Sequence, residues 1–268
     1  MVTIPRLFVD APLGEGAVLP LPREQAHYLV NVMRREAGSP VRVFNGRNGE
    51  WQAVVAGASR KGASLQVEAR LREQIGVPPL RLCFAPVKKA RTDFIVEKAT
   101  ELGVAALQPV ITRRTQAERV RTDRLLALAI EAAEQTERLC LPAISEPVTL
   151  ERLLADWPAG ERLIFCDEAG DGEGAWGGPQ GRARPMLDML QGETDPSGPW
   201  AVLIGPEGGF DEAERAQLRS LPFVRAVTLG PRILRADTAA LAALTLWQAA
   251  TGDWRPRGRW STTLRDAP

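Results

Sequence analysis

The sequence has few of the side chains that most often bind metals or act as nucleophiles. Its 268 residues include three cysteines, Cys83, Cys140 and Cys166, which lie far apart and form no C-x-x-C pair, so they predict neither a zinc site nor a disulfide framework. His27 is the only histidine, which excludes a histidine-based metal cluster and argues against a Ser-His-Asp triad. No G-x-x-x-x-G-K-[ST] phosphate loop occurs either. The chemistry of this chain must therefore use other groups.

Long apolar runs are also missing. No uninterrupted apolar stretch reaches the roughly 18 residues that suggest a membrane span, and residues 1–25 lack the pattern of a secretory signal. We therefore expect a soluble, cytoplasmic protein with no membrane partner and no metal. With 44% apolar residues the chain can bury a substantial core, and its length allows two modest domains.

The net charge of +1 conceals an uneven distribution of charge along the chain. Residues 1–121 carry 19 Lys and Arg against 11 Asp and Glu, whereas residues 122–268 carry 15 against 22. A basic amino-terminal half suits a polyanionic partner such as RNA. An ordinary solvated surface with charged side chains is the alternative interpretation.

Residues 1–72 show short runs of β-favouring residues separated by turn signals, which predicts a small β-barrel domain. The strand candidates are Val41–Phe44, Trp51–Val55 and Leu65–Ala69. Before these strands, the apolar spacing of His27–Arg35 predicts a helix that ends in Arg34 and Arg35. These two arginines could bind phosphates or simply oppose the helix dipole.

A proline-rich linker at residues 73–79 separates this barrel from a second domain at residues 80–256, which a tail at residues 257–268 follows. Strands and helices alternate in the second domain, which predicts an open parallel α/β sheet with ligand groups beyond the carboxyl ends of the strands. The expected strands are Leu80–Ala85, Val104–Ile111, Arg162–Cys166, Trp200–Ile204 and Val224–Leu229. The expected helices are Thr92–Leu102, Arg124–Leu139, Asp211–Ser220 and Thr238–Ala250.

Two strand-loop-helix units near the carboxyl terminus predict one ligand pocket. In the first, the apolar run Trp200–Ile204 stops at Gly205-Pro206-Glu207-Gly208-Gly209; in the second, a strand leads into Gly230-Pro231-Arg232-Ile233-Leu234-Arg235. Small residues let a ligand approach the backbone, whose free N–H groups can bind it. The first loop taken alone could equally be a tight turn that needs two residues with positive φ.

Basic residues follow the first two strands of the same domain. Because the strands are expected to be parallel, these side chains would share a sheet edge with the glycine loops, where they could contact phosphates. They are Lys88, Lys89, Arg91, Arg113 and Arg114. On the Arg124–Leu139 helix, Glu134 and Arg138 form either an ordinary exposed i,i+4 ion pair or part of a substrate site.

The composition of residues 167–199 and of Thr238–Ala250 predicts how each segment is exposed or buried. Residues 167–199 contain eight glycines and predict a flexible surface insertion with a helical hint at Met186–Leu190; their formal G-x-G-x-x-G at Gly172 lacks the following helix and is not expected to bind a dinucleotide. The Thr238–Ala250 helix is apolar around most of its circumference, so it should be buried in the domain or in a dimer interface, with Trp247 in that core.

Four segments carry a family resemblance, in the same order along the chain. Leu203–Phe210 and Leu229–Arg235 resemble the paired signatures of the 16S ribosomal RNA uracil-N3 methyltransferase family of the SPOUT superfamily, and Lys98–Val104 and Glu134-Gln135 with Arg138 resemble two more. The resemblance implies a PUA-like RNA-binding barrel and a SPOUT-type knotted parallel sheet with helices on both faces. It also implies a homodimer that uses S-adenosylmethionine to methylate N3 of a uridine in 16S rRNA or the assembled small ribosomal subunit.

On this resemblance we expect specific residues to carry the reaction. Catalytic roles are expected for Arg113, Arg138, Arg235, Glu101 and Glu134. Cofactor contacts are expected from Leu203, Ile204, Gly205, Pro206, Glu207, Gly208, Gly209, Leu229, Gly230, Arg232, Ile233, Leu234 and Thr238. RNA contacts are expected from Arg34, Arg35, Lys88, Lys89, Arg91, Lys98 and Arg114. Glu101, Glu134, Glu207 or a water could be the general base, and methylation of another RNA or atom, or RNA binding without catalysis, stays an alternative.

Overall fold

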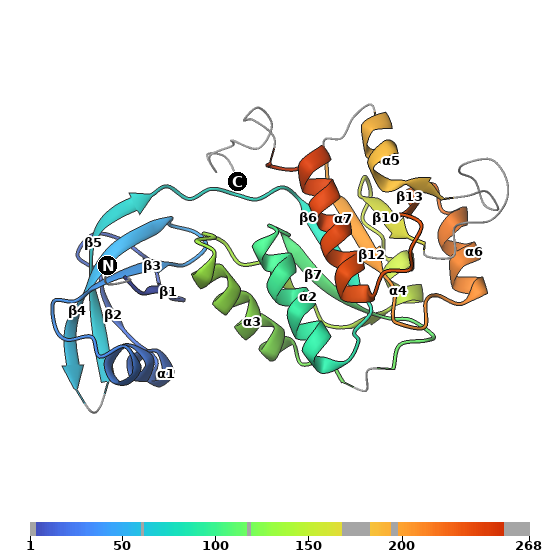
Figure 1. Cartoon of the computed structure of the whole chain (residues 1–268). Helices are drawn as coiled ribbons and strands as arrows, with labels where there is room; N and C mark the ends of the chain where they lie inside the picture. Colours follow the sequence, from blue (N-terminus) through green and yellow to red (C-terminus); the bar gives the residue numbers. More distant parts are fainter. Residues whose placement is uncertain (1–3, 60–61, 117–118, 168–182, 194–197, 255–268) are drawn as a thin grey trace. The chain divides into compact units, whose positions relative to one another are not determined.

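The computed structural model describes residues 4–59, 62–116, 119–167, 183–193 and 198–254. These residues divide into two compact units, which are drawn in Figure 1. The first unit contains the described chain up to Gly76 together with Ala133–Leu141, and the second contains Val77–Ala132 and the described chain from Pro142 to Trp254. The Ala133–Leu141 segment thus belongs with the amino-terminal unit, although it lies within the sequence range expected for the second domain.

The first unit contains a five-stranded sheet in the order β1-β3-β4-β5-β2, in which β1 runs parallel to β3 and the other pairs are antiparallel. Its strands are β1 (Arg6–Phe8), β2 (Val18–Pro20), β3 (Pro40–Phe44), β4 (Glu50–Ser59) and β5 (Gly62–Arg72). Half-buried and buried residues alternate over the first six residues of β5, as the period of two along a strand requires, and exposed residues follow them. The predicted small barrel is therefore confirmed as a β-domain, in the form of a curled, open sheet.

The helix of the first unit differs from the prediction at both ends. Helix α1 (Arg23–His27) starts four residues before His27, and it continues into the π-helical turn η1 (Tyr28–Val32). The helical path ends at Met33, because Arg34 has a φ of 53°, a left-handed conformation that cannot continue a right-handed helix. The predicted helix over His27–Arg35 was thus wrong in its bounds, and Arg34 and Arg35 follow the helix instead of capping its last turn.

The second unit is built on a parallel sheet in the order β11-β13-β10-β12-β6-β7-β8, with β9 paired to β7. Strands β10 (Arg162–Cys166) and β12 (Trp200–Ile204) have the predicted bounds. The other strands are β6 (Leu80–Phe84), β7 (Ala106–Ile111), β8 (Ala143–Ile144), β9 (Val148–Thr149), β11 (Arg184–Pro185) and β13 (Val224–Thr228). All carboxyl ends therefore meet at one edge, as the alternation of strands and helices predicted.

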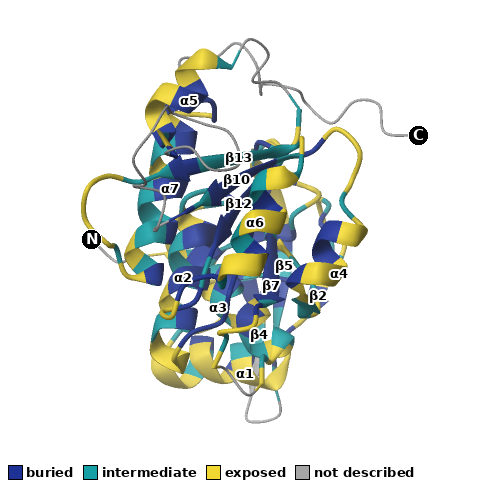
Figure 2. Cartoon of the chain, turned by 90° about the vertical axis from the view of Figure 1, so that its right-hand side faces the viewer, coloured by how far each residue is buried: buried dark blue, intermediate teal, exposed yellow. Residues whose placement is uncertain are grey.

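Helices cover both faces of this sheet, and Figure 2 shows the buried strands between half-exposed helices. Val202 and Ile204 pack into one core cluster, whereas Ala201 and Leu203 pack into another on the opposite face. The helices are α2 (Lys89–Glu101), α3 (Thr122–Gln135), α4 (Leu150–Ala155), α5 (Met186–Gly192), α6 (Glu212–Ser220) and α7 (Ala236–Ala250). No helix among the described residues is long and apolar enough to cross a membrane.

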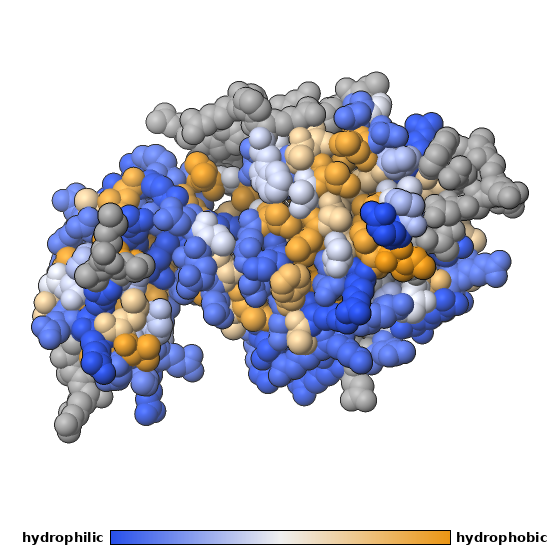
Figure 3. Space-filling view, in the orientation of Figure 1, coloured by the Kyte–Doolittle hydropathy of each residue, from blue (hydrophilic) through white to orange (hydrophobic). Residues whose placement is uncertain are grey.

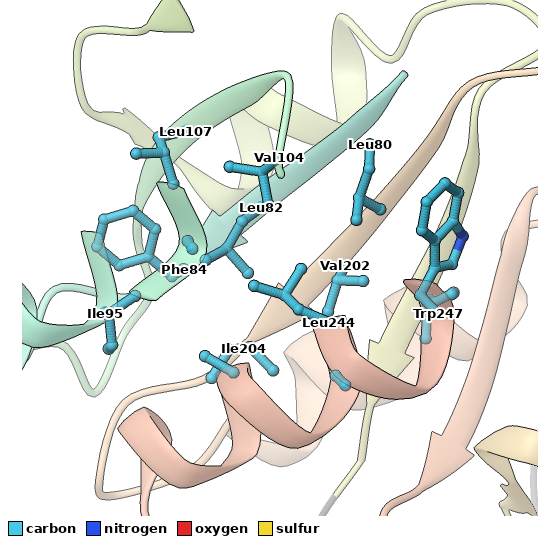
Figure 4. Packing of buried hydrophobic residues seen from close by; sticks show 14 of the residues in the cluster. Leu80, Leu82, Phe84, Ile95, Val104, Leu107, Val202, Ile204, Leu244 and Trp247 are labelled. Atoms are coloured by element: carbon cyan, nitrogen blue, oxygen red, sulfur yellow. The ribbon is translucent and has the colours of Figure 1, made fainter. Parts of the chain in front are cut away.

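Helix α7 is the central helix of one of these cores. Leu244 and Trp247 are fully buried and pack against β-strand residues that include Leu82 and Val202 (Figure 4). The buried Gln248 donates a hydrogen bond of 2.6 Å from Nε2 to the carbonyl oxygen of Leu102, at the end of α2. The prediction that this apolar helix and its tryptophan belong to a core is confirmed.

The prediction of a surface insertion at residues 167–199 is wrong for a part of that range. Its formal G-x-G-x-x-G lies outside the described residues. Helix α5 occupies the predicted helical hint, and Met186, Met189 and Leu190 are buried in the same core as α7. These three apolar side chains lie at i, i+3 and i+4, a helical stripe that the surrounding glycines and prolines obscured.

Candidate functional site

A cavity of about 200 Å³ opens at the carboxyl edge of the sheet in the second unit. Its walls come from the end of β10, the loop after β12 and the loop after β13, and its floor includes the start of α7. We call residues 205–209 the first loop and residues 229–235 the second loop. The two loops that the sequence paired therefore do line one cavity, with β10 between their parent strands.

The first loop follows β12 and approaches the cavity with its backbone. Gly209 has a φ of 66° and its N–H donates a 2.9 Å hydrogen bond to the carbonyl oxygen of Pro206, which closes a turn. Only this glycine of the first loop has a positive φ, so the turn requires one such residue and not two. Gly205 is needed for a different reason: a Cβ there would lie 2.6 Å from Cε2 of the buried Phe210 ring.

The second loop forms the opposite wall. Gly230 has a φ of 121°, and its N–H lies 3.3 Å from the Thr228 hydroxyl oxygen, which accepts the hydrogen bond. Ile233 is 82% exposed although it lines the cavity, so an apolar side chain stands at the mouth. Arg235 also lines the cavity and occupies the N-cap position of α7.

Most of the residues expected to contact a cofactor are brought together here. Those that line the cavity are Ile204, Gly205, Pro206, Glu207, Gly209, Leu229, Gly230, Arg232, Ile233 and Leu234. The remaining three do not line it within the described part of the chain. Leu203 is buried in the opposite core, Gly208 points its carbonyl oxygen at Arg114, and Thr238 is exposed in the first turn of α7.

The end of β10 supplies a wall that the sequence analysis did not assign. Asp167 is 2% exposed and its carboxylate accepts hydrogen bonds from Arg215 at 3.0 Å and from Arg219 at 2.8 Å, both on α6. Burial raises the pKa of the neighbouring Cys166 thiol to about 12, which makes it a poor nucleophile. Both residues follow directly from the rule that ligands bind beyond the carboxyl ends of parallel strands, because β10 was predicted with its correct end.

Three arginines surround the first loop on its outer side, and we call Arg91, Arg113 and Arg114 the outer arginines. Arg114 Nη1 donates a 2.8 Å hydrogen bond to the Gly208 carbonyl oxygen, and Arg113 Nη1 donates one of 2.7 Å to Asp211. The hydrogen bond that Arg113 donates to the Asp211 carboxylate raises the pKa of the Arg113 guanidinium. Arg91 lies 3.9 Å from a Glu207 carboxylate oxygen. Arg91 and Arg114, which were expected to contact RNA, thus contact the first loop, and Arg113, which was expected to hold the reacting base, contacts the residue at which α6 begins.

Other expected catalytic residues lie elsewhere in the chain. Glu134 and Arg138 belong to the first unit, where Glu134 accepts a 2.8 Å hydrogen bond from the Phe8 N–H and the Arg138 carbonyl oxygen accepts one of 2.6 Å from Arg6. Glu101 lies at the end of α2 and accepts a 2.7 Å hydrogen bond from Lys98. Neither Glu101 nor Lys98 lines the cavity among the residues that the structure describes.

The basic residues after β6 lie on the expected sheet edge. Lys88 is the N-cap residue of α2, Lys89 starts that helix, and both are exposed. Hydrogen bonds from Lys98 to Glu101 and Glu97 raise the pKa of the Lys98 ammonium. Within the described residues, no group of three or more His, Cys, Asp and Glu side chains is arranged to hold a metal ion.

Comparisons with known proteins agree with this arrangement. A family model described as an RNA methyltransferase domain matches residues 76–248, and one described as an RNA methyltransferase PUA domain matches residues 21–68. The ribosomal RNA small subunit methyltransferase E of Rickettsia conorii is 28% identical over 240 residues, which cover 89% of this chain and 93% of that protein. The protein of that name from Synechocystis is 31% identical over 232 residues, covering 85% and 72% respectively.

A solved structure is similar over almost the whole chain. The crystal structure of a ribosomal RNA small subunit methyltransferase E from Neisseria gonorrhoeae, bound to S-adenosylmethionine, has a TM-score of 0.79 and 27% sequence identity, and the match covers 94% of this chain and 100% of that one. The two family models also match the two units in their order along the chain. The chain therefore belongs to the RNA methyltransferase family with an amino-terminal PUA domain, whose members include the ribosomal RNA small subunit methyltransferases E.

Proposed function

We propose that this protein transfers a methyl group from S-adenosylmethionine to N3 of a uridine in 16S ribosomal RNA. The observation that carries the proposal is the single cavity between the first and second loops, at the carboxyl edge of a parallel sheet. The relatives are named for methylation of small-subunit ribosomal RNA, and the Neisseria gonorrhoeae protein is bound to S-adenosylmethionine.

The residues that line the cavity suit a cofactor of this kind. Gly205, Gly209 and Gly230 have no side chain, so a ligand can approach the backbone of both loops closely, while Leu229 and Leu234 supply apolar surface. When bound, S-adenosylmethionine supplies an activated methyl group on a sulfonium. The chain itself must orient that group and keep competing water away.

The uridine must lose its N3 proton, and the negative charge that develops on O2 and O4 must be stabilised. Arg232 and Arg235 both line the cavity; we assign Arg232 to the cofactor and Arg235 to the charge on the base. Arg113 and Arg138 are proposed to assist in holding the base, and Glu207 is the candidate base that lines the cavity. Glu101, Glu134 and a water molecule are retained as alternative proton acceptors.

Recognition of RNA is assigned to cations on both units. N3 lies on the pairing edge of uracil, so the target must be unpaired or turned out of its helix. We propose that Lys88, Lys89, Arg91 and Arg114 contact phosphates near the cavity, that Lys98 does so near the end of α2, and that Arg34 and Arg35 do so on the PUA domain. The substrate is 16S rRNA or the assembled small subunit, which places the enzyme in the cytoplasm.

We also propose that the active form is a homodimer. Leu241 and Leu246 of α7 are only partly buried within one chain, and Ile233 nearby in the sequence is strongly exposed. Figure 3 shows apolar side chains gathered over this helix. A second copy of the chain would cover them. The knot implied by the family resemblance stays a prediction.

The proposal is tested by mapping the modified nucleosides of 16S rRNA from a strain that lacks this gene. One 3-methyluridine is expected to disappear by mass spectrometry, together with the stop that it causes in reverse transcription, and to return with the wild-type gene. Loss of a different methylated nucleoside would support action on another RNA or atom. A protein that binds RNA but gives no calorimetric signal with S-adenosylmethionine would support a binding module without catalysis.

Two substitutions test the arginine assignments. We expect Arg113→Ala and Arg138→Ala each to reduce methylation of small ribosomal subunits. If both variants methylate at the wild-type rate, the proposed role of these two side chains fails, while the assignment of the cofactor cavity stands.

A further inference from the structure

The first loop contains three glycines, and glycine loses more conformational freedom than any other residue type when the chain becomes ordered. A loop that is ordered only when its ligand arrives weakens binding by that cost, whereas contacts that order it beforehand strengthen binding. Backbone hydrogen bonds within the loop are few: among the described residues, one joins the Gly209 N–H to the Pro206 carbonyl oxygen. Its order must come largely from neighbouring elements.

The outer arginines provide these contacts from two other loops of the same unit. Arg113 and Arg114 follow β7, and Arg91 lies in the first turn of α2. Gly208 is the one residue of 204–210 that does not line the cavity, and its carbonyl oxygen accepts the hydrogen bond from Arg114. The stem of Arg114 also lies against Gly208, because a Cβ added to this glycine would be 3.5 Å from the Cβ of Arg114.

The residues that follow the first loop are held by Arg113 through both backbone and side chain. Its N–H donates a 2.9 Å hydrogen bond to Glu214, and its guanidinium donates to Asp211. Asp211 and Glu214 form the capping box that starts α6, so the end of the loop and the start of the helix are tied to one arginine. Hydrogen bonds from the Glu214 backbone and the Arg113 side chain lower the pKa of Asp211.

Arg91 connects the two walls of the cavity. Its guanidinium lies 3.9 Å from Glu207 in the first loop and 4.0 Å from Asp237 in the first turn of α7, which follows the second loop. Within the described part of the chain, none of the outer arginines lines the cavity. The effect of these side chains on a cofactor in the cavity is therefore expected to act through the loop.

From this geometry we propose that Arg114, supported by Arg113 and Arg91, is a positioning residue that pre-orders the first loop for cofactor binding. The inference rests on the proposed function for the identity of the cofactor. A positioning role for Arg114 can be distinguished from a role in binding RNA phosphate alone. If Arg114 bound only phosphate, replacing it would leave the affinity for the cofactor unchanged when RNA is absent.

The test measures the affinity of the purified full-length protein for S-adenosylmethionine by calorimetry without RNA. Arg114→Ala is expected to bind the cofactor about five-fold more weakly than the wild type, because a charge-assisted hydrogen bond to the loop is lost. Arg114→Lys is expected to recover part of the affinity, since an ammonium can still donate to Gly208. The matched control is Arg152→Ala, which removes an exposed arginine from an ion pair with Asp156 on α4 and should bind like the wild type.

A second measurement does not depend on the cofactor. Hydrogen exchange followed by mass spectrometry should show faster exchange in the peptide that covers residues 204–212 of Arg114→Ala, with no change in Arg152→Ala. Wild-type cofactor affinity and wild-type exchange of this peptide in Arg114→Ala would overturn the positioning role. If the wild type itself does not bind S-adenosylmethionine, the proposed function fails, and the exchange measurement still decides whether Arg114 orders the loop.

Discussion

The clearest structural prediction concerns the substitution Gly205→Ala in the first loop. A Cβ at this position would lie 2.6, 3.0 and 3.2 Å from three ring atoms of Phe210, closer than side chains can approach without a shift. Phe210 is 7% exposed and packs edge-to-face on Phe165 with ring centroids 5.0 Å apart, so its ring has little room to move. Overpacking of this kind costs about 1–3 kcal/mol of stability.

For a unit of this size, each kcal/mol lowers the melting temperature by about 2–4 °C, so Gly205→Ala should lower it by roughly 2 to 12 °C. The matched control is Gly208→Ala, whose added Cβ would meet Arg114 at 3.5 and 3.6 Å, an ordinary contact. Its stability should stay within about 0.5 kcal/mol of the wild type. Thermal unfolding followed by circular dichroism gives both values.

The steric contact between residue 205 and the Phe210 ring also predicts the stability of the double variant Gly205→Ala/Phe210→Leu. Replacing the ring removes the atoms that the new methyl group meets, so the two substitutions together should destabilise less than the sum of their separate effects. Equal melting temperatures for Gly205→Ala and Gly208→Ala, or exact additivity in the double variant, would refute the packing argument.

Three other predictions address separate parts of the chain. Burial raises the pKa of the Glu50 carboxyl, but hydrogen bonds from Arg72 and Arg6 outweigh burial, so the pKa in the folded protein is lowered. The ionised Glu50 therefore stabilises the first unit above the ordinary pKa of 4.5, and this stabilisation is lost as the pH falls through the lower pKa of the folded protein. Glu50→Gln should destabilise the first unit by roughly 3–5 kcal/mol at neutral pH and make its stability in urea unfolding depend less on acid pH. Met189→Ala should lower the free energy of unfolding by about 2–5 kcal/mol in the same assay, because α5 is part of the core. A decrease below about 0.5 kcal/mol would instead indicate that α5 lies on the surface. Arg235→Ala should lower kcat for methyl transfer by about 10²–10³ while calorimetry shows nearly unchanged cofactor affinity, and an unchanged kcat would remove Arg235 from charge stabilisation.

Much of the second unit was predictable from local patterns. Apolar runs that end at glycine loops predicted β10 and β12 with their correct bounds, because a strand buried on both faces has few polar residues within it. The same parallel arrangement brought the two loops to one edge, and thus most of the expected cofactor residues to one cavity. These features depend on residues close together in the sequence.

The contacts that the sequence did not predict are pairings that local patterns do not contain. Glu134 looked like a surface or substrate residue by helical spacing, yet it accepts the N–H of Phe8, 126 residues away. Arg113 and Arg114 looked like phosphate ligands, yet their hydrogen-bond partners, Asp211 and Gly208, are 98 and 94 residues away. Which charge meets which partner depends on the packing of distant elements, so composition predicted the presence of these cations and not their contacts.

The bounds of α1 illustrate a different limit. The apolar spacing of Leu29, Val32 and Met33 fits a regular helix, but the structure forms a π-helical turn in which Leu29 is buried and Val32 is exposed. A wider turn changes which side chains share a face, so a period of 3.6 residues assigns them incorrectly. The left-handed conformation of Arg34 then ends the helix without a glycine to mark the position.

The most direct test of the central claim is methyl transfer in a purified system. Small ribosomal subunits from a strain that lacks the gene are incubated with the wild-type protein and S-adenosylmethionine carrying a labelled methyl group, and the 16S rRNA nucleosides are then separated by mass. The account predicts incorporation of the label as 3-methyluridine at a single position, and reduced incorporation with Arg235→Ala. No incorporation, or label found only in another nucleoside, would contradict it.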